Sequence, residues 1–226
     1  MAFNEESYRK LVSELQKDDV TLIAVSKTKP ADVVQSAYDA GHRDFGENYV
    51  QELTSKYESL PKDIRWHFIG HLQRNKVKFI APFVHLIHGV DTLKLAREID
   101  KEGRKAGRVI DGLIQVHIAN EDTKHGFLPD EVEDAISQLA SYGLTHFKVR
   151  GLMGMATFTE DSEQVRDEFR KLSALNKRLR NSEQKIAAHM NILSMGMSGD
   201  YKIAVEEGSN MVRIGSLIFG ARNYDK

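Results

Sequence analysis

The sequence predicts an α/β fold, a single-domain barrel in which eight parallel strands alternate with helices. Eight short apolar runs rich in β-branched residues recur along the 226 residues, and longer segments with helical spacing separate them. No Pro-rich or Gly/Ser-rich linker divides residues 1–226, which favours one domain. Eight strand–helix units in this length suit a closed (β/α)8, TIM-like barrel. An open, doubly wound sheet is the alternative.

Each expected strand is a short apolar segment. The eight segments are TLIAVS, RDFGE, RWHFIG, VHLIHGV, DGLIQVHI, FKVRGLMGMAT, NILSMG and MVRIGS, which begin at Thr21, Arg43, Arg65, Val84, Asp111, Phe147, Asn191 and Met211.

Helices are expected where apolar residues recur every three or four positions. One runs from Val33 to Tyr38 and stops before Gly41, and a second runs from Val132 to Leu139. A third contains Val165, Phe169, Leu172, Leu175 and Leu179.

Composition excludes several classes of protein. The 32 Lys and Arg nearly balance the 33 Asp and Glu, and a net charge of -1 offers no field to recruit nucleic acid. The absence of cysteine excludes disulfides and thiolate metal sites. No apolar run approaches the ~18 residues that span a bilayer, and the charged start lacks the features of a secretory signal. We therefore expect no membrane partner and a cytoplasmic location.

A lysine pair follows the first expected strand. Chemistry in such barrels gathers at the carboxyl ends of the strands, where SKTKP places Lys27 and Lys29. Side chains alternate along a strand, so Lys27 shares a face with Ile23 and Val25. A desolvated lysine has a lowered pKa and can attack a carbonyl as the neutral amine. A rim lysine that reaches solvent or an ion pair is the alternative, and Lys29 has the same parity as Lys27.

Small residues follow the last two expected strands. Ser194 to Asp200 (SMGMSGD) precedes a helical segment, and Gly215 with Ser216 forms a similar turn. Free backbone N–H groups in such turns can bind an anion, and barrels often bind phosphate in the loops after strands 7 and 8. Ordinary turns with a capping Ser198 are the alternative.

Six ordered segments resemble the YggS/PROSC family of pyridoxal-phosphate homeostasis proteins. They are AVSKTKP, FGENYVQE, WHFIGHLQRNK, GLMGM, LSMGMSGD and VRIGSLIFG, and they extend over residues 21–222. The resemblance implies a barrel of the alanine racemase N-terminal domain type, without the racemase's second domain. It also implies pyridoxal 5'-phosphate (PLP) as cofactor, covalently attached to Lys27 as an internal aldimine.

The resemblance implies roles for further residues. The phosphate would bind Gly215, Ser216 and the loop that contains Ser194, Met195 and Ser198. Arg213 would approach the pyridine nitrogen, which a guanidinium cannot protonate. A strand arginine paired with a carboxylate is the alternative. Asn48 could contact the ring hydroxyl or simply form a turn.

No metal site is expected. His67 and His71 have i, i+4 spacing, but His67 falls in a strand and no HExxH sequence is present. No chemical step follows for His71 or Asn75. Four methionines are expected to pack in the barrel: Met153, Met155, Met195 and Met197.

The expected function is PLP homeostasis (vitamin B6) by a non-catalytic carrier or regulator. Racemisation needs two positioned acid–base groups, and the sequence nominates only Lys27. A weak racemase or other PLP-dependent enzyme with a second base such as Tyr49 or Lys29 is the alternative. A barrel that binds a metal or a sugar phosphate without PLP is a third possibility. PLP-dependent apoenzymes are possible acceptors, and a monomer is preferred.

Overall fold

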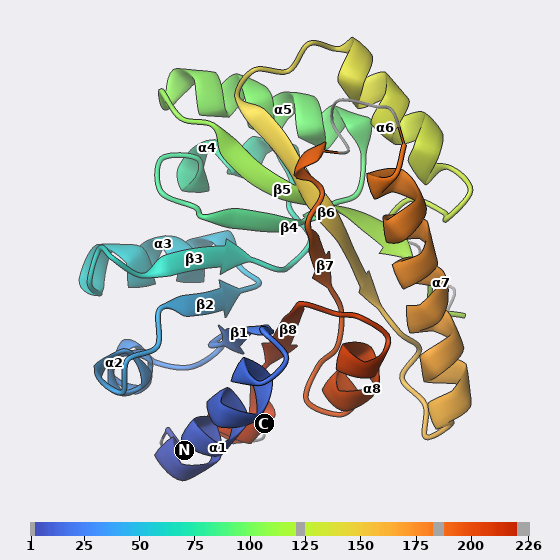
Figure 1. Cartoon of the computed structure of the whole chain (residues 1–226). Helices are drawn as coiled ribbons and strands as arrows, with labels where there is room; N and C mark the ends of the chain where they lie inside the picture. The colour runs from blue at the N-terminus through green and yellow to red at the C-terminus, as the bar shows by residue number, and fades with distance from the viewer. Residues whose placement is uncertain (1–2, 121–124, 183–187, 221–226) are drawn as a thin grey trace.

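The computed structural model describes residues 3–120, 125–182 and 188–220. Its eight strands are all parallel and close into a barrel in the order of the chain (Figure 1). This confirms the closed barrel over the open sheet. The strands are β1 (Thr21–Val25), β2 (Asp44–Glu47), β3 (Arg65–Phe68), β4 (Leu86–Val90), β5 (Ile110–His117), β6 (Phe147–Met155), β7 (Ile192–Ser194) and β8 (Met211–Ile214).

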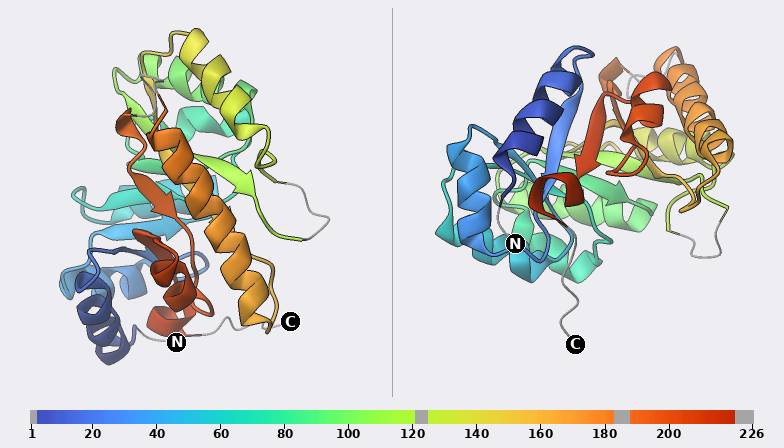
Figure 2. Two further views of the ribbon diagram at one scale, coloured as in Figure 1. Left: turned by 45° about the vertical axis from the view of Figure 1, so that its right-hand side comes forward. Right: turned by 90° about the horizontal axis from the view of Figure 1, so that it is seen from below.

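Helices cover the outside of the barrel (Figures 1 and 2). They are α1 (Glu5–Gln16), α2 (Ala31–Asp39), α3 (Val50–Ser59), α4 (Val77–Ile80), α5 (Leu93–Lys105), α6 (Val132–Ser141), α7 (Ser162–Arg180), α8 (Tyr201–Glu206) and α9 (Ser216–Phe219), and a 3-10 turn, η1 (Arg74–Lys76), precedes α4. The three predicted helices correspond to α2, α6 and α7. None of the described helices is both long and apolar enough to cross a membrane.

Helix α1 is an element that was not predicted from the sequence. Its buried residues Tyr8, Leu11 and Leu15 recur at helical spacing, and the side chain of Asn4 accepts a hydrogen bond from Ser7 N at 3.0 Å. The N–H of Asn4 also donates to the carbonyl of Ile218 at 2.9 Å. The first helix therefore lies against the last turn of the described chain (Figure 2).

Apolar packing forms two layers. The larger cluster lies between strands and helices, and the smaller one fills the barrel with Ile23, Leu86, Leu113, Met153 and Met211. Within β1, Ile23 belongs to the inner layer while Leu22 and Ala24 belong to the outer one. The predicted alternation is therefore confirmed.

The methionine prediction is half right. Met153 and Met195 are buried, but Met155 and Met197 are 42% and 37% exposed, so the packing prediction is wrong for these two. Met155 is the last residue of β6, and Met197 lies in the connection between β7 and α8.

Candidate functional site

Lys27 lies in a tight turn directly after β1. It is half-buried, and the next residue, Thr28, has a φ of +63°, a left-handed conformation that is unfavourable for a β-branched residue. The N–H of Thr28 donates to a carboxylate oxygen of Glu52 at 2.6 Å, and Lys29 N donates to the carbonyl of Ser26 at 3.0 Å. These contacts hold the backbone on both sides of Lys27.

A buried ion-pair network supports this turn from helix α3. The ammonium group of Lys56 donates to Glu47 and Glu52, both at 2.7 Å, and to the carbonyl of Ser26 at 2.8 Å. The hydroxyl of Ser26 donates to the same Glu47 oxygen at 2.6 Å. Burial raises the pKa of Glu47 to about 7 against the opposing effect of Lys56. A charged anchor therefore fixes the segment before Lys27.

The structure distinguishes the two lysines that periodicity could not. The ammonium group of Lys29 donates to the carbonyl of Phe219 at 2.8 Å and to that of Gly220 at 3.5 Å. Lys29 thus satisfies carbonyl groups at the end of α9, as cations commonly do at helix C-termini. Lys27, by contrast, lies half-buried in the turn directly after β1.

The turns after β7 and β8 lie side by side. The N–H of Gly215 donates to the hydroxyl of Ser198 at 3.4 Å, which joins the two turns directly. A Cβ added at Gly215 would lie 3.0 Å from the carbonyl oxygen of Val25, so this turn also lies against the end of β1. The first, seventh and eighth strand ends therefore meet in one place.

These turns present backbone N–H groups that an anion could use. The N–H groups of Ser198, Gly199 and Ser216 donate to no other residue in the described part of the chain. Gly196, with a φ of +95°, lies in the turn that leads to these groups. The position favours glycine, because an added Cβ would lie 2.6 Å from the Cβ of Ala204. The arrangement fits a phosphate group.

Arg213 points into the barrel and is 4% exposed. Its guanidinium donates to the carbonyl of Ser194 at 2.9 Å, to the Ser194 hydroxyl at 2.7 Å and to the carbonyl of Gly154 at 3.0 Å. Burial lowers the pKa of Arg213 to about 10, which keeps it charged at neutral pH. No carboxylate among the described residues hydrogen-bonds to it, but the Asp200 carboxylate attracts it electrostatically and opposes the effect of burial.

The remaining predicted site residues, Asn48, Ser194 and Met195, differ in their burial and hydrogen bonds. Asn48 follows β2, and its Oδ1 is buried without a hydrogen-bond partner among the described residues. Ser194 is fully buried with its hydroxyl inside the barrel, and Met195 is buried in the outer core. The N–H and carbonyl of Met195 both bond to the hydroxyl of Ser209. Ser194 and Met195 therefore make buried contacts that stabilise the start of the turn after β7.

Three potential metal ligands meet in the connections that follow β3, β4 and β5. His71, Asp91 and His125 follow β3, β4 and β5, and their ligand atoms lie within 4.8 Å of one another. His71 Nδ1 lies 2.9 Å from Asp91 Oδ2, and the two imidazole rings are partly stacked. Sequence spacing could not reveal this group, because each residue follows a different strand. Asn75 is exposed in η1 and lies outside the group.

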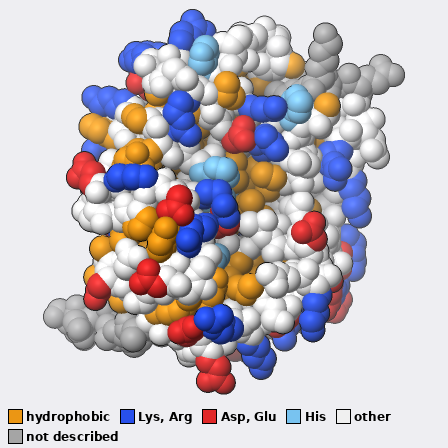
Figure 3. Space-filling model, turned by 60° about the vertical axis from the view of Figure 1, so that its left-hand side comes forward, with side chains coloured by type: hydrophobic (Ala, Val, Ile, Leu, Met, Phe, Trp, Pro, Cys, Tyr) orange, Lys and Arg blue, Asp and Glu red, His pale blue; other side chains and the backbone are white. Residues whose placement is uncertain are grey.

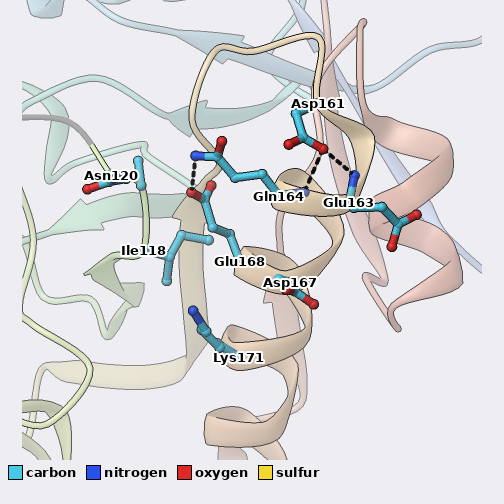
Figure 4. Close-up of a pocket in the computed structure, with 9 residues that line it drawn as sticks. Ile118, Asn120, Asp161, Glu163, Gln164, Asp167, Glu168 and Lys171 are labelled. Carbon is cyan, nitrogen blue, oxygen red and sulfur yellow. Dashed lines mark hydrogen bonds between the residues drawn. The ribbon is translucent and has the colours of Figure 1, made fainter.

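A pocket of about 590 Å³ lies beside the start of α7 and contains none of the predicted site residues (Figure 4). Asp161 accepts hydrogen bonds from the N–H groups of Glu163 and Gln164 and so caps the helix. Glu168 accepts bonds from both the N–H and the hydroxyl of Thr157 at 2.7 Å. These carboxylates stabilise the connection between β6 and α7.

Comparison with known proteins places these features in a family context. The family described as alanine racemase, N-terminal domain, matches residues 4–223. A pyridoxal phosphate homeostasis protein of Aquifex aeolicus is 43% identical over 204 residues, which cover 90% of this chain and 87% of that protein. The human protein of the same name is 42% identical over 215 residues, covering 91% and 78%.

Solved structures agree. PipY of Synechococcus elongatus with PLP bound is 34% identical, with a TM-score of 0.85 over 96% of this chain and 99% of that one. An alanine racemase of Clostridium difficile has a TM-score of 0.74 over 99% of this chain and 58% of its own, and at 15% identity it shows the shared fold alone.

Proposed function

The chain belongs to the pyridoxal phosphate homeostasis protein family, and on that premise we propose that it binds PLP at the joined ends of β1, β7 and β8. The observation that carries this proposal is the contact between the three strand ends. A half-buried lysine lies two residues after Val25, and Val25 packs against Gly215, whose turn is bonded to Ser198. PLP combines an aldehyde with a phosphate, and this site combines an amine with free N–H groups.

The described residues fit each part of the cofactor. We propose that Lys27 forms the covalent link, that the turns of Ser198 and Ser216 hold the phosphate, and that Arg213 contacts the pyridine nitrogen. Asn48 Oδ1, buried without a partner among the described residues, can accept a hydrogen bond from the ring hydroxyl. The relative PipY, whose structure contains bound PLP, supports PLP as the ligand.

PLP supplies an aldehyde that condenses with amines and a ring that withdraws electrons. Arg213 would limit the electron withdrawal by the ring. A guanidinium only donates hydrogen bonds, so Arg213 at the ring nitrogen leaves that nitrogen unprotonated and weakens the ring as an electron sink. We therefore propose a carrier or regulator of PLP rather than an efficient enzyme, with PLP-dependent apoenzymes as acceptors. The names of the relatives support this role.

Borohydride reduction of PLP-loaded protein followed by peptide mass mapping tests the proposal. We expect a pyridoxyl group on the peptide that contains Lys27, and none in Lys27→Ala. Lys29→Ala is the matched control, because Lys29 binds the end of α9 and its loss leaves the link intact. A pyridoxyl group on another lysine, or none at all, would overturn the proposal.

Deuterium exchange tests the non-catalytic part. Amino acids incubated with PLP-loaded protein in D₂O should show no exchange at the α-carbon above that of Lys27→Ala. Turnover at catalytic rates would instead support the weak racemase.

A further inference from the structure

A line of polar side chains crosses the interior of the barrel. It begins at Arg213, which donates to the Ser194 hydroxyl at 2.7 Å. Ser194 Oγ lies 3.1 Å from His88 Nδ1, and His88 Nε2 lies 3.0 Å from His67 Nδ1. His67 Nε2 lies 3.2 Å from a carboxylate oxygen of Asp44. Four contacts therefore connect a buried cation near the strand ends to a carboxylate at the start of β2.

The carboxylate end determines which atoms carry protons. Hydrogen bonds from Arg65 and His67 hold the pKa of Asp44 below its usual range although burial opposes them, so Asp44 only accepts. His67 Nε2 must then carry the proton. In a neutral ring Nδ1 of His67 is an acceptor, so Nε2 of His88 is the donor to it. By the same argument His88 Nδ1 accepts, and Ser194 donates.

The cationic end leads to the same assignment. Arg213 has no acceptor atom, so the Ser194 oxygen accepts from it. Among the described residues, His88 is the other partner of this hydroxyl, and the hydroxyl proton must point to His88 Nδ1. The two ends fix the same direction independently. Every hydrogen bond therefore runs from Arg213 toward Asp44.

Burial keeps both histidines neutral. His67 and His88 are 1% and 0% exposed, and burial lowers the pKa of both below the ordinary value for histidine. The charged and titratable groups that face them are Asp44, Arg65, His85 and Arg213. Only Asp44 favours a proton on His67, and Arg213 disfavours one on His88. The neutral rings can therefore keep one fixed tautomer.

We propose that Asp44, His67, His88 and Ser194 form a one-directional hydrogen-bond chain that positions Arg213 as a donor to the cofactor ring. The use of this donor rests on the proposed function, whereas the direction of the chain does not. Each bond polarises the next, so the distant carboxylate partly compensates the buried guanidinium. The chain ends at Asp44, the first residue of β2. Acidic and basic side chains are interspersed on the face of the molecule shown in Figure 3.

Tautomers measured by NMR test the direction of the chain without cofactor. In protein labelled with 15N-histidine, long-range 1H–15N spectra distinguish Nδ1–H, Nε2–H and doubly protonated rings. We expect Nε2–H for both His67 and His88 at neutral pH, where burial and its lowering of both pKa values favour the neutral rings. Signals are assigned with His67→Gln and His88→Gln. An Nδ1–H tautomer or an imidazolium at either position would overturn the chain.

Affinity for PLP tests the positioning role. His88→Leu breaks the chain, and we expect about a tenfold increase in the Kd for PLP, the effect of one lost charge-assisted hydrogen bond. His88→Gln should restore most of the affinity, because its carbonyl can accept from Ser194 while its amide donates to His67. His85→Leu, at an exposed neighbour outside the chain, should bind PLP as the unmodified protein does.

The outcomes separate the two proposals. If the unmodified protein does not bind PLP, the proposed function fails and the tautomer measurement still decides the chain. If it binds PLP and His88→Leu binds equally well, or if His88→Gln is as weak as His88→Leu, the positioning role is wrong.

Discussion

Replacement of Lys56 by Met should lower the free energy of unfolding far more than replacement of an exposed, paired lysine such as Lys101. Lys56 and Glu47 have side chains that are 6% and 0% exposed, and their closest atoms are 2.7 Å apart. Removing one partner of a buried ion pair costs about 3–5 kcal/mol, because the other charge stays buried without compensation. Methionine has a similar shape to lysine, so the loss reports charge and hydrogen bonds rather than a cavity.

The pH dependence follows from Glu47. Burial already raises its pKa to about 7, above the ordinary value for glutamate, so the folded state binds the proton more tightly than the unfolded state. The contribution of such a group to the stability of the fold is lost as the pH rises through its folded pKa. Without Lys56 this pKa should rise further. The stability of Lys56→Met should therefore fall more steeply with pH between pH 6 and pH 8 than that of the unmodified protein.

Urea unfolding provides the assay. Trp66 is the single tryptophan of the sequence and is fully buried, so its fluorescence reports the transition. Lys101→Met, which removes an exposed pair with Glu98, is the control and should leave the midpoint almost unchanged. Glu47→Gln combined with Lys56→Met should recover more than half of the loss. A Lys56→Met midpoint equal to that of Lys101→Met, or no recovery in the double variant, would refute the reasoning.

Two further predictions concern the turn after β7 and the buried histidines. Gly196→Ala should destabilise the fold by about 1–3 kcal/mol in urea, since φ is +95° and the added Cβ meets that of Ala204 at 2.6 Å; an unchanged midpoint would show that the turn can shift. Burial lowers the pKa of His67 and His88, so stability should fall as pH drops below about 6.5, where the unfolded chain takes up protons that the folded one does not. Glu47 gives stability the opposite dependence on pH, but it is present in both the unmodified protein and His88→Gln. The difference between these two proteins in how steeply stability falls with pH therefore reports His88 alone. Equal slopes would contradict the neutral assignment of His88.

The strands were predictable because a parallel barrel needs short apolar segments at regular spacing. Helix α1 was missed although Tyr8, Leu11 and Leu15 have helical spacing and Asn4 is a suitable cap. The charged residues at its start drew attention to the absence of a secretory signal instead. Its helical signal was therefore present but unused.

The supporting contacts of the site could not be predicted. Lys56 is a polar residue within an amphipathic helix, and no local pattern distinguishes it from a solvated lysine. His67 and His88 lie on different strands, and their rings meet only through the register that pairs His67 with Leu86. A register of this kind follows from closure of the whole barrel rather than from either segment.

The choice between Lys27 and Lys29 has the same origin. Both lysines have the parity of Ile23, and the contacts of Lys29 with the carbonyl groups of Phe219 and Gly220 come from near the other end of the described chain. The family resemblance favours Lys27 from its place in SKTKP, and this assignment stays a prediction that borohydride reduction tests.

The pairing of β1 with β8 also determines when the binding site can form during protein synthesis. Lys27 follows the first strand to leave the ribosome and Arg213 lies in the last, and Ile23 opposite Arg213 brings their strands together. While β8 is still in the exit tunnel, the nascent chain carries the lysine without the arginine or the second turn. Under the proposed function, capture of PLP would therefore follow release of the last strand, and a chain that ends before β8 would have Lys27 without Arg213 or the turn of Ser216.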